Sequence, residues 1–266
     1  MRLPLCALGL LSFFALAADA AENLETLQTR PGVEQSFLHV QAERSRATLV
    51  LFAGGPGALR LKKDAKGITM AWGDSDFLVR TRVEFVRAGF SVATLDAPSD
   101  QQTERGMLGG FRAGAAHCQD VEAVVGWLRK RNAGPVWLVG TSRGTESVAN
   151  CAGRLGRGID GLILSSPITR PNLSGPHVTT LDLGKILVPS LIVVHEADEC
   201  EHAPASGGHL IMSKLTQSPR KELKVVRGGE RPRTKPCQGL SAHGFLGVES
   251  QVIDAIANFI RVAPRV

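Results

Sequence analysis

The chain has 266 residues, of which 43% are apolar and 21% are charged. These values are typical of a folded protein with a substantial core and exclude a disordered chain. The formal net charge is +6, but the densest basic cluster, residues 227–235, is interspersed with glycine and proline instead of aromatic residues. A nucleic-acid-binding module is expected to show a basic face with stacking residues or a known motif. We therefore expect no nucleic-acid partner and interpret the cluster as a solvated loop.

The first twenty residues have the pattern of a signal peptide. Arg2 precedes an apolar run over residues 3–18, and Ala18-Asp19-Ala20 fits the small-x-small rule for cleavage before Ala21. The run is too short for a comfortable membrane span, and we expect no membrane span later in the chain. We predict a signal peptide over residues 1–20, cleavage near Ala20, and an exported protein that is periplasmic or secreted. A buried N-terminal helix is the alternative.

Export changes the interpretation of the cysteines. Cleavage would remove Cys6 and leave Cys118, Cys151, Cys200 and Cys237, an even number in an oxidising compartment. Four cysteines allow three pairings, among which spacing alone does not choose. Free buried thiols are the alternative.

Apolar runs typical of strands alternate with helical stretches along the chain, which predicts a mainly parallel sheet with helices on its faces. We expect one α/β domain over residues 21–266, without repeats or linkers. An N-terminal hairpin is predicted from residues 35–41 and 47–52. The further strands are predicted at residues 90–95, 135–139, 161–165, 190–195 and 222–226, and the helices at 76–89, 117–131, 142–155 and 248–262. The connection between residues 165 and 190 is too short for a large helical cap, so we expect an open cleft.

The most informative motif is Gly140-Thr141-Ser142-Arg143-Gly144, which follows an apolar strand and precedes a helix. A G-x-S-x-G turn between a strand and a helix projects the serine hydroxyl from a strained backbone, and its glycines leave room where a Cβ would collide. The helix N-terminus favours negative charge that develops on a substrate. An ordinary Gly-Ser turn is the alternative if the pentapeptide is taken alone.

A serine nucleophile needs a base and an orienting acid. In folds where the nucleophile lies on a strand-to-helix turn of this kind, they follow it in the chain order Asp or Glu, then His. After the strand at residues 190–195, Asp198 is our preferred acid and Glu199 is the alternative. His243 lies just before the last helix and is the preferred base. The other histidines near the acid loop are His195, His202 and His209.

Two backbone amides are also needed to stabilise the oxyanion. One is expected from Arg143, the residue after the nucleophile, and the other from the glycine-rich turn after an early strand. We assign the second amide to Gly55, with Gly54 as the alternative. A phosphate-binding loop is not indicated, because the turn lacks both the Lys-Ser/Thr pair and the G-x-G-x-x-G spacing.

With these residues in place, the chain resembles the α/β-hydrolase superfamily along almost all of its predicted mature length, as a small, nearly capless and exported member. The motifs that carry the resemblance are Gly54-Gly55-Pro56-Gly57, Asp96-Ala97-Pro98, Gly140-Thr141-Ser142-Arg143-Gly144, Asp198 and His243. The Gly-Gly-Pro-Gly turn is similar to that of the proline iminopeptidase branch, in which a histidine precedes it. Ala53 stands in that place here, which argues against aminopeptidase activity.

The resemblance implies a serine hydrolase that cleaves an ester through an acyl-enzyme, with a small-molecule acyl substrate and neither a metal nor an organic cofactor. A peptidase or amidase on the same triad, and a hydrolase-fold protein that binds without turnover, are the alternatives. The Arg143 side chain either holds an acidic substrate group, faces solvent or pairs with a carboxylate. The sequence does not indicate an oligomeric state.

The resemblance to this superfamily also implies a pairing of the four cysteines. A Cys200–Cys237 bridge would tether the acid loop to the base loop, and Cys118 and Cys151 would join two neighbouring helices. A zinc site at His195, Cys200 and His202 is the weaker alternative, because the C-x-x-C spacing of structural zinc sites is missing.

Overall fold

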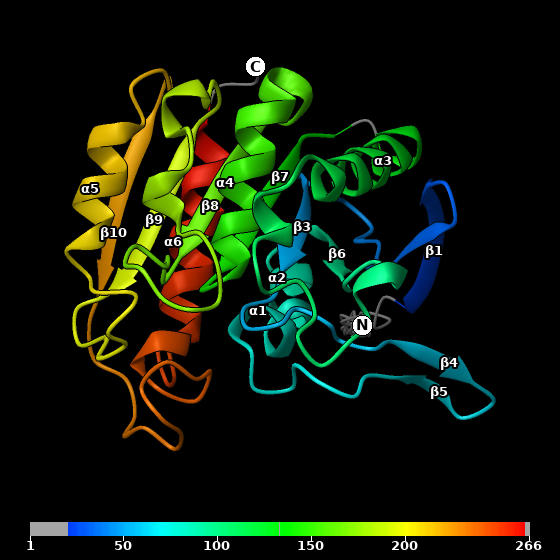
Figure 1. The fold of residues 1–266 in the computed structure, drawn as a ribbon, viewed down its shortest axis with the longest axis horizontal. Coiled ribbons are helices and arrows are strands. Elements are labelled where there is room, and N and C mark those ends of the chain that lie inside the picture. The colour runs from blue at the N-terminus through cyan, green and yellow to red at the C-terminus, as the bar shows by residue number, and fades with distance from the viewer. Residues whose placement is uncertain (1–20, 133, 264–266) are drawn as a thin grey trace, which may run out of the picture.

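The computed structural model describes residues 21–132 and 134–263. The predicted signal peptide lies outside these residues. The described part contains an eight-stranded sheet with the order β1-β2-β6-β3-β7-β8-β9-β10 and a separate two-stranded hairpin (Figure 1). The strands of the sheet are β1 (Glu22–Arg30), β2 (Val33–Val40), β3 (Thr48–Phe52), β6 (Ser91–Leu95), β7 (Val136–Thr141), β8 (Gly161–Ser165), β9 (Ser190–His195) and β10 (Lys221–Val226).

The sheet is mixed but mostly parallel. The β1–β2 and β2–β6 pairs are antiparallel, and every pair from β6 to β10 is parallel. The predicted α/β class with a mainly parallel sheet is therefore confirmed.

The predicted N-terminal hairpin is wrong in its partner. The strand at residues 35–41 pairs with β1 and β6, and β6 lies between it and β3. The sequence neighbours β2 and β3 are therefore not sheet neighbours. The small hairpin β4 (Lys62–Asp64) with β5 (Gly67–Thr69) is a further element that the sequence pattern did not predict.

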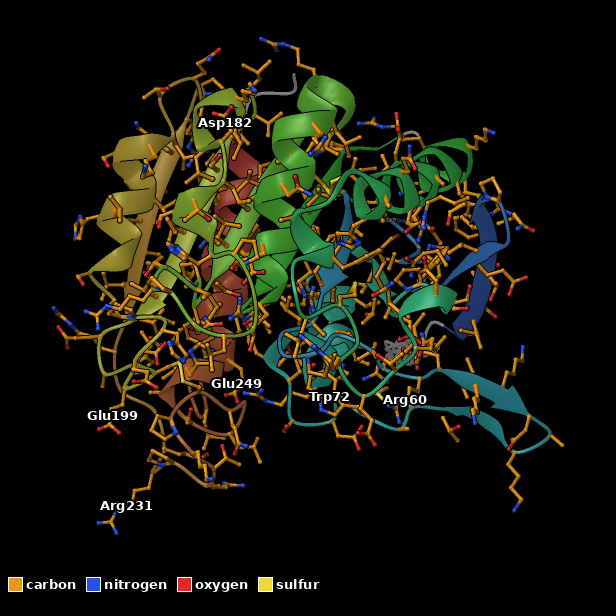
Figure 2. The ribbon with its side chains drawn as sticks, viewed as in Figure 1. Arg60, Trp72, Asp182, Glu199, Arg231 and Glu249 are labelled. Atoms are coloured by element: carbon orange, nitrogen blue, oxygen red, sulfur yellow. A yellow bond between two sulfur atoms is a disulfide. The ribbon has the colours of Figure 1, made fainter. Side chains whose placement is uncertain are left out.

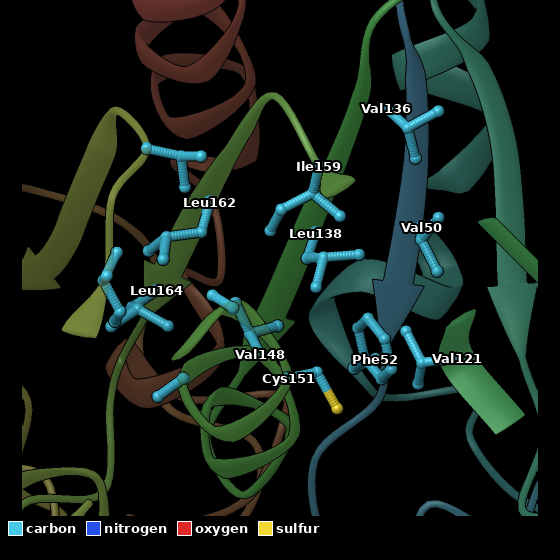
Figure 3. Packing of buried hydrophobic residues seen from close by; sticks show 14 of the residues in the cluster. Val50, Phe52, Val121, Val136, Leu138, Val148, Cys151, Ile159, Leu162 and Leu164 are labelled. Carbon is cyan, nitrogen blue, oxygen red and sulfur yellow. The ribbon is translucent and has the colours of Figure 1, made fainter. Parts of the chain in front are cut away.

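Helices cover both faces of the sheet because each buried strand sends alternate side chains to opposite faces. In β3, Val50 and Phe52 belong to one core cluster, and Leu49 and Leu51 belong to another. The first cluster includes residues of α3 (Ala115–Arg131), α4 (Gly144–Leu155) and α5 (Gly207–Lys214) and is shown in part in Figure 3. The second includes residues of α1 (Phe77–Arg80), α2 (Arg82–Arg87) and α6 (Glu249–Val262), and α6 lies behind the sheet in Figure 1.

The predicted helix at residues 76–89 is divided at Thr81 into α1 and α2, whereas the cap at Asp76 is present, with its carboxylate accepting from Leu78 N and Val79 N. The helical segments of the connection from β8 to β9 are two short 3-10 turns, at Val178–Thr180 and Leu183–Lys185. The expected minimal cap is therefore confirmed. Among the described residues, no helix is both long and apolar enough to cross a bilayer.

Candidate active site

Ser142 sits at a sharp turn between β7 and α4, where the chain passes from the sheet into a helix. Its φ of 52° lies in the left-handed region, which a serine rarely occupies. The amide of Ser142 donates to Ser165 O at the end of β8, at 3.0 Å. The strained conformation is thus fixed by the neighbouring strand, and strain of this kind is typical of functional positions.

The two glycines of the motif are demanded by close backbone packing. A Cβ on Gly144 would lie 2.0 Å from Phe52 O, and a Cβ on Gly140 would lie 2.5 Å from Gly144 O. Strand β3, the turn and α4 therefore approach one another more closely than any side chain would allow. The turn can hold Ser142 in this position only with glycine at both sites.

His243 and Asp198 are joined by a hydrogen bond. His243 Nδ1 lies 2.8 Å from Asp198 Oδ2, and the exposed fractions of the two side chains are 4% and 1%. The other carboxylate oxygen accepts from Cys200 N at 2.9 Å. Glu199, the alternative acid, is exposed and projects from the molecule in Figure 2. The structure brings Asp198 to the imidazole and leaves Glu199 outside.

The backbone around His243 is fixed by serines. His243 is part of a short 3-10 turn, Ala242–Gly244, that Ser241 caps by accepting from His243 N. Ser166 Oγ, just after β8, donates to His243 O at 2.7 Å. The loop thus anchors the histidine to the sheet edge that also carries Ser142.

Both Ser142 and His243 line one pocket of about 280 Å³ at the carboxyl end of the parallel strands. The walls come from four chain segments, around positions 54–55, 72–77, 141–142 and 234–244. His243 Nε2 is buried and has no hydrogen-bond partner among the described residues. One ring nitrogen is therefore occupied by Asp198, and the other has no partner among the described residues, in a histidine that lines the same pocket as Ser142.

Two backbone amides beside Ser142 make no hydrogen bond to the described residues: those of Gly55 and Arg143. The Gly54 amide, in contrast, donates to Asp76 Oδ2 at 2.8 Å. Gly55 adopts a φ of 49°, and Trp72 packs so closely that a Cβ on Gly55 would lie 2.9 Å from its ring. Of the two glycines considered for the oxyanion hole, only Gly55 therefore has an available amide.

The side chain of Arg143 is buried and forms an ion pair with Glu146 one helical turn later. Its Nη1 atom also donates to Pro176 O at 3.0 Å. Arg143 does not line the pocket. Of the three roles that the sequence left open for this side chain, the structure shows the carboxylate pairing.

Burial perturbs the ionisable groups beneath the turn. Burial raises the pKa of the Asp76 carboxyl above its ordinary value, although the amides of Gly54, Val79 and Leu78 oppose this shift. Burial likewise raises the pKa of Glu146, against the pull of Arg143 and Arg112. Burial lowers the pKa of the Arg112 guanidinium to about 10. Two cations and two carboxyl groups thus lie buried next to the candidate site.

The other candidate histidines are placed differently. His195 Nε2 contacts Gly228 O at 2.9 Å, and its Nδ1 accepts from Ala197 N at 3.1 Å, so both ring nitrogens are occupied. His202 lies next to Glu201, and His209 is exposed at the start of α5. Cys200, part of the weaker zinc alternative, is engaged in a disulfide. Within residues 21–132 and 134–263, no group of three His, Cys, Asp or Glu side chains is placed to hold a metal ion.

The structure joins Cys200 to Cys237 and Cys118 to Cys151. The first bridge links the loop of Asp198 to the loop before His243, and Cys237 itself lines the pocket. The second bridge joins α3 to α4. Two disulfides indicate an oxidising compartment.

Sequence reasoning missed three residues around the site. Arg112 is fully buried and donates to Ala53 O and Gly55 O of the glycine-rich turn. Trp72 and Thr234 line the pocket from loops that have no regular pattern. No periodicity marks such residues, and an isolated arginine between Gly110 and Gly114 is normally interpreted as exposed.

A larger hollow of about 550 Å³ beside Arg60 and Asp96 contains neither Ser142 nor His243.

No family model and no curated protein matches the sequence. The structure, however, is similar to many solved structures. An α/β serine hydrolase without a lid from Xanthomonas campestris is 17% identical, with a TM-score of 0.59, over 92% of this chain and 96% of that one. An esterase from Pyrococcus furiosus is 14% identical with a TM-score of 0.63, over 92% and 93% of the two chains. A dienelactone hydrolase from Anabaena variabilis is 13% identical with a TM-score of 0.65, over 93% and 100%.

These identities are low, but the likeness covers nearly the full length of each chain. The protein therefore has the fold of the α/β serine hydrolases.

Proposed function

We propose that this protein is an exported serine esterase in which Ser142, His243 and Asp198 form the catalytic triad. The observation that carries the proposal is the Asp198–His243 hydrogen bond. His243 lines the same pocket as Ser142, whose backbone is in the left-handed region. We further propose that residues 1–20 are a signal peptide and that residues 21–266 form a single hydrolase domain.

In the proposed mechanism, the Ser142 hydroxyl attacks the ester carbonyl and His243 Nε2 accepts its proton. Asp198 holds the proton of Nδ1 and stabilises the imidazolium that forms. The proton then passes from Nε2 to the departing alkoxide, which leaves an acyl-Ser142. A water molecule then attacks the acyl group while Nε2 accepts its proton. Nε2 gives this proton to Ser142 Oγ as the acyl–oxygen bond breaks, which releases the acid and free Ser142.

The negative oxygen of each tetrahedral intermediate is assigned to the amides of Gly55 and Arg143. The support is that these N–H groups have no acceptor among the described residues, whereas that of Gly54 has one. The N-terminus of α4 adds a favourable dipole at the same place. One such donor is worth about 3 kcal/mol in the transition state.

The pocket favours a small substrate. Its volume of about 280 Å³ is near the lower end of the range for small-molecule sites. Trp72 and Phe77 supply apolar surface, and Thr234 and Gln238 supply polar groups. Solved esterases of the same fold also support an ester substrate. We therefore assign short-chain acyl esters as the substrate class.

A serine-directed fluorophosphonate probe tests the proposal. The wild-type chain, produced in an oxidising compartment, is expected to be labelled, and Ser142→Ala and His243→Ala are expected to remain unlabelled. Hydrolysis of p-nitrophenyl acetate, butyrate and octanoate is then compared with that of alanine p-nitroanilide. Faster turnover of the acetate supports the short-chain esterase, and faster turnover of the anilide would replace it with an amidase. Equal labelling of wild type and Ser142→Ala would contradict the esterase and favour the alternative, a protein of this fold that binds a ligand without turnover.

A further inference from the structure

Two buried charged side chains hold the glycine-rich turn after β3 from opposite sides. Asp76, from the start of α1, accepts from Gly54 N at 2.8 Å. Arg112, from the 3-10 turn before α3, donates to Ala53 O at 3.0 Å and to Gly55 O at 3.2 Å. The polar backbone groups on either side of the Gly55 amide are therefore fixed by charge-assisted hydrogen bonds, which are stronger than neutral ones.

The two oxygens of the Asp76 carboxylate have separate partners. Oδ1 caps α1 by accepting from Leu78 N at 3.0 Å and from Val79 N at 3.3 Å, and Oδ2 accepts from Gly54 N alone. A helix cap needs only one acceptor oxygen, which serine or asparagine also provides. The second oxygen therefore has a function that the capping of α1 does not explain.

The Gly54 contact lies next to the nucleophile. The position that a Cβ on Gly54 would occupy is 3.0 Å from Ser142 Cβ and 3.3 Å from Asp76 Oδ2. Asp76 also lines the pocket that contains Ser142. A negative charge at this place opposes a developing oxyanion, so its presence needs a reason.

That charge is balanced by buried partners. Burial raises the pKa of the Asp76 carboxyl, and the Arg80 charge opposes this shift. The charges of Glu146 and Asp76 favour the charged form of Arg112, and that of Arg143 opposes it. With Arg112, Arg143, Asp76 and Glu146 all ionised, the formal charges cancel. The arrangement allows a carboxylate to hold the turn without leaving an unpaired charge beside Ser142.

We propose that Asp76 is a positioning residue of the esterase, which aims the Gly55 amide at the oxyanion by holding the Gly54 amide. The inference rests on the proposed function, because an amide needs to be aimed only if a negative oxygen forms at Ser142. Donors that stabilise an oxyanion act by being oriented before the reaction, and they lose most of their effect when they are free to turn away.

Two substitutions separate capping from positioning. Asp76→Asn keeps one acceptor oxygen, but its NH₂ group then faces another donor, either Gly54 N or the first amides of α1. Asp76→Ser keeps a hydroxyl that caps α1 and is too short to reach Gly54. Asp76→Ser is expected to lower kcat for p-nitrophenyl acetate by about 100-fold, as the loss of one oxyanion-hole donor does. Asp76→Asn is expected to lose less kcat, because its single oxygen can still accept from Gly54 N at the expense of the helix cap. KM is expected to change by less than about threefold, because the contact serves the transition state.

Asp96 offers a matched control. Asp96 is also buried and accepts from the amides of Leu59, Arg60, Leu61 and Ala97. It therefore fixes a later part of the same loop, which does not include Gly55. Asp96→Asn is expected to lower the melting temperature at least as much as Asp76→Ser while keeping kcat within about threefold of wild type. A trifluoromethyl ketone, whose adduct carries a negative oxygen, is expected to bind Asp76→Ser more weakly by the factor lost in kcat/KM.

The inference is overturned if folded Asp76→Ser keeps the wild-type kcat, or if Asp96→Asn loses as much kcat as Asp76→Ser. The proposed function fails by a different result, namely wild-type turnover that Ser142→Ala does not abolish. The comparison of wild type with Ser142→Ala is made first, so the two failures are distinguishable.

Discussion

The disulfide between Cys200 and Cys237 joins the two loops whose side chains meet in the Asp198–His243 hydrogen bond. Cys200 lies two residues after Asp198, and its amide donates to the second carboxylate oxygen at 2.9 Å. The bridge therefore acts on the acid through the backbone and on the pocket wall through Cys237.

Removing this bridge is expected to lower both stability and activity. Its partners are 37 residues apart, which corresponds to about 4 kcal/mol of loop-closure entropy. The Cys200→Ala/Cys237→Ala variant should lose a stability of that order in urea unfolding, and also lose kcat because the wall and the acid loop are released. Cys118→Ala/Cys151→Ala, which removes a bridge of 33 residues, should lose similar stability but keep kcat. Equal kcat losses in the two variants would contradict the link to the site.

Asp198 and Glu199 form a second matched pair for mutation. Asp198→Asn keeps the shape of the side chain but removes the charge that holds the histidine tautomer, and kcat should fall by about ten-thousand-fold. Glu199→Gln changes an exposed side chain and should leave kcat unchanged. Steady-state ester hydrolysis measures both. A large loss of kcat in Glu199→Gln but not in Asp198→Asn would show that Glu199, and not Asp198, is the acid of the triad.

The glycines of the serine turn give a stability prediction. Gly144→Ala would place a Cβ 2.0 Å from Phe52 O, so the free energy of unfolding should fall by about 3 kcal/mol or more. Gly126, in the middle of α3, has open space around its Cβ position. Gly126→Ala should raise the stability by about 0.5–1 kcal/mol. Urea unfolding of the two variants measures this difference, and a similar change in the free energy of unfolding in both would contradict the close packing at Gly144.

His117 predicts how stability depends on pH. Burial, with the nearby charges of Arg112 and Arg30, lowers the pKa of this ring from 6.5 to about 3. The unfolded chain then binds the proton more readily than the folded one. The contribution of His117 is complete above pH 6.5 and is lost as the pH falls toward 3, by about 1.4 kcal/mol for each pH unit.

His117→Phe should remove this acid sensitivity. The ring nitrogens have no partners among the described residues, and the ring packs against Phe52 and Phe111, so an aromatic replacement keeps the contacts. Thermal unfolding at pH 7 and pH 5 measures the difference. An unchanged pH dependence would show that another group causes the acid sensitivity.

The strands at Gly161–Ser165 and Ser190–His195 have the bounds that the sequence predicted, because each is a short buried run that ends at a turn. The N-terminal pairing was not predictable in the same way. Neighbouring runs usually pair, but β6 forms parallel pairs with β3 and separates it from β2. Strand order depends on packing between distant segments, which a local pattern does not contain.

The same limit applies to the site. The Ser142 turn and the helix cap at Asp76 are local features and have local signals. The second contact of Asp76 is with Gly54, which lies 22 residues earlier, and Arg112 reaches Ala53 across 59 residues. Neither contact has a spacing rule. The polar groups that support the turn could therefore be found only after the chain was folded.

The nucleophilic role of Ser142 is tested most directly by detecting the acyl group on its side chain. The wild-type protein is mixed with p-nitrophenyl acetate, quenched in acid during the first turnovers, digested and analysed by mass spectrometry. Acetyl is expected on the peptide that contains Ser142, together with a burst of p-nitrophenol equal to the concentration of sites, and neither is expected in Ser142→Ala. Turnover in the wild type without an acyl group on Ser142, or with that group on another residue, would show that Ser142 is not the nucleophile.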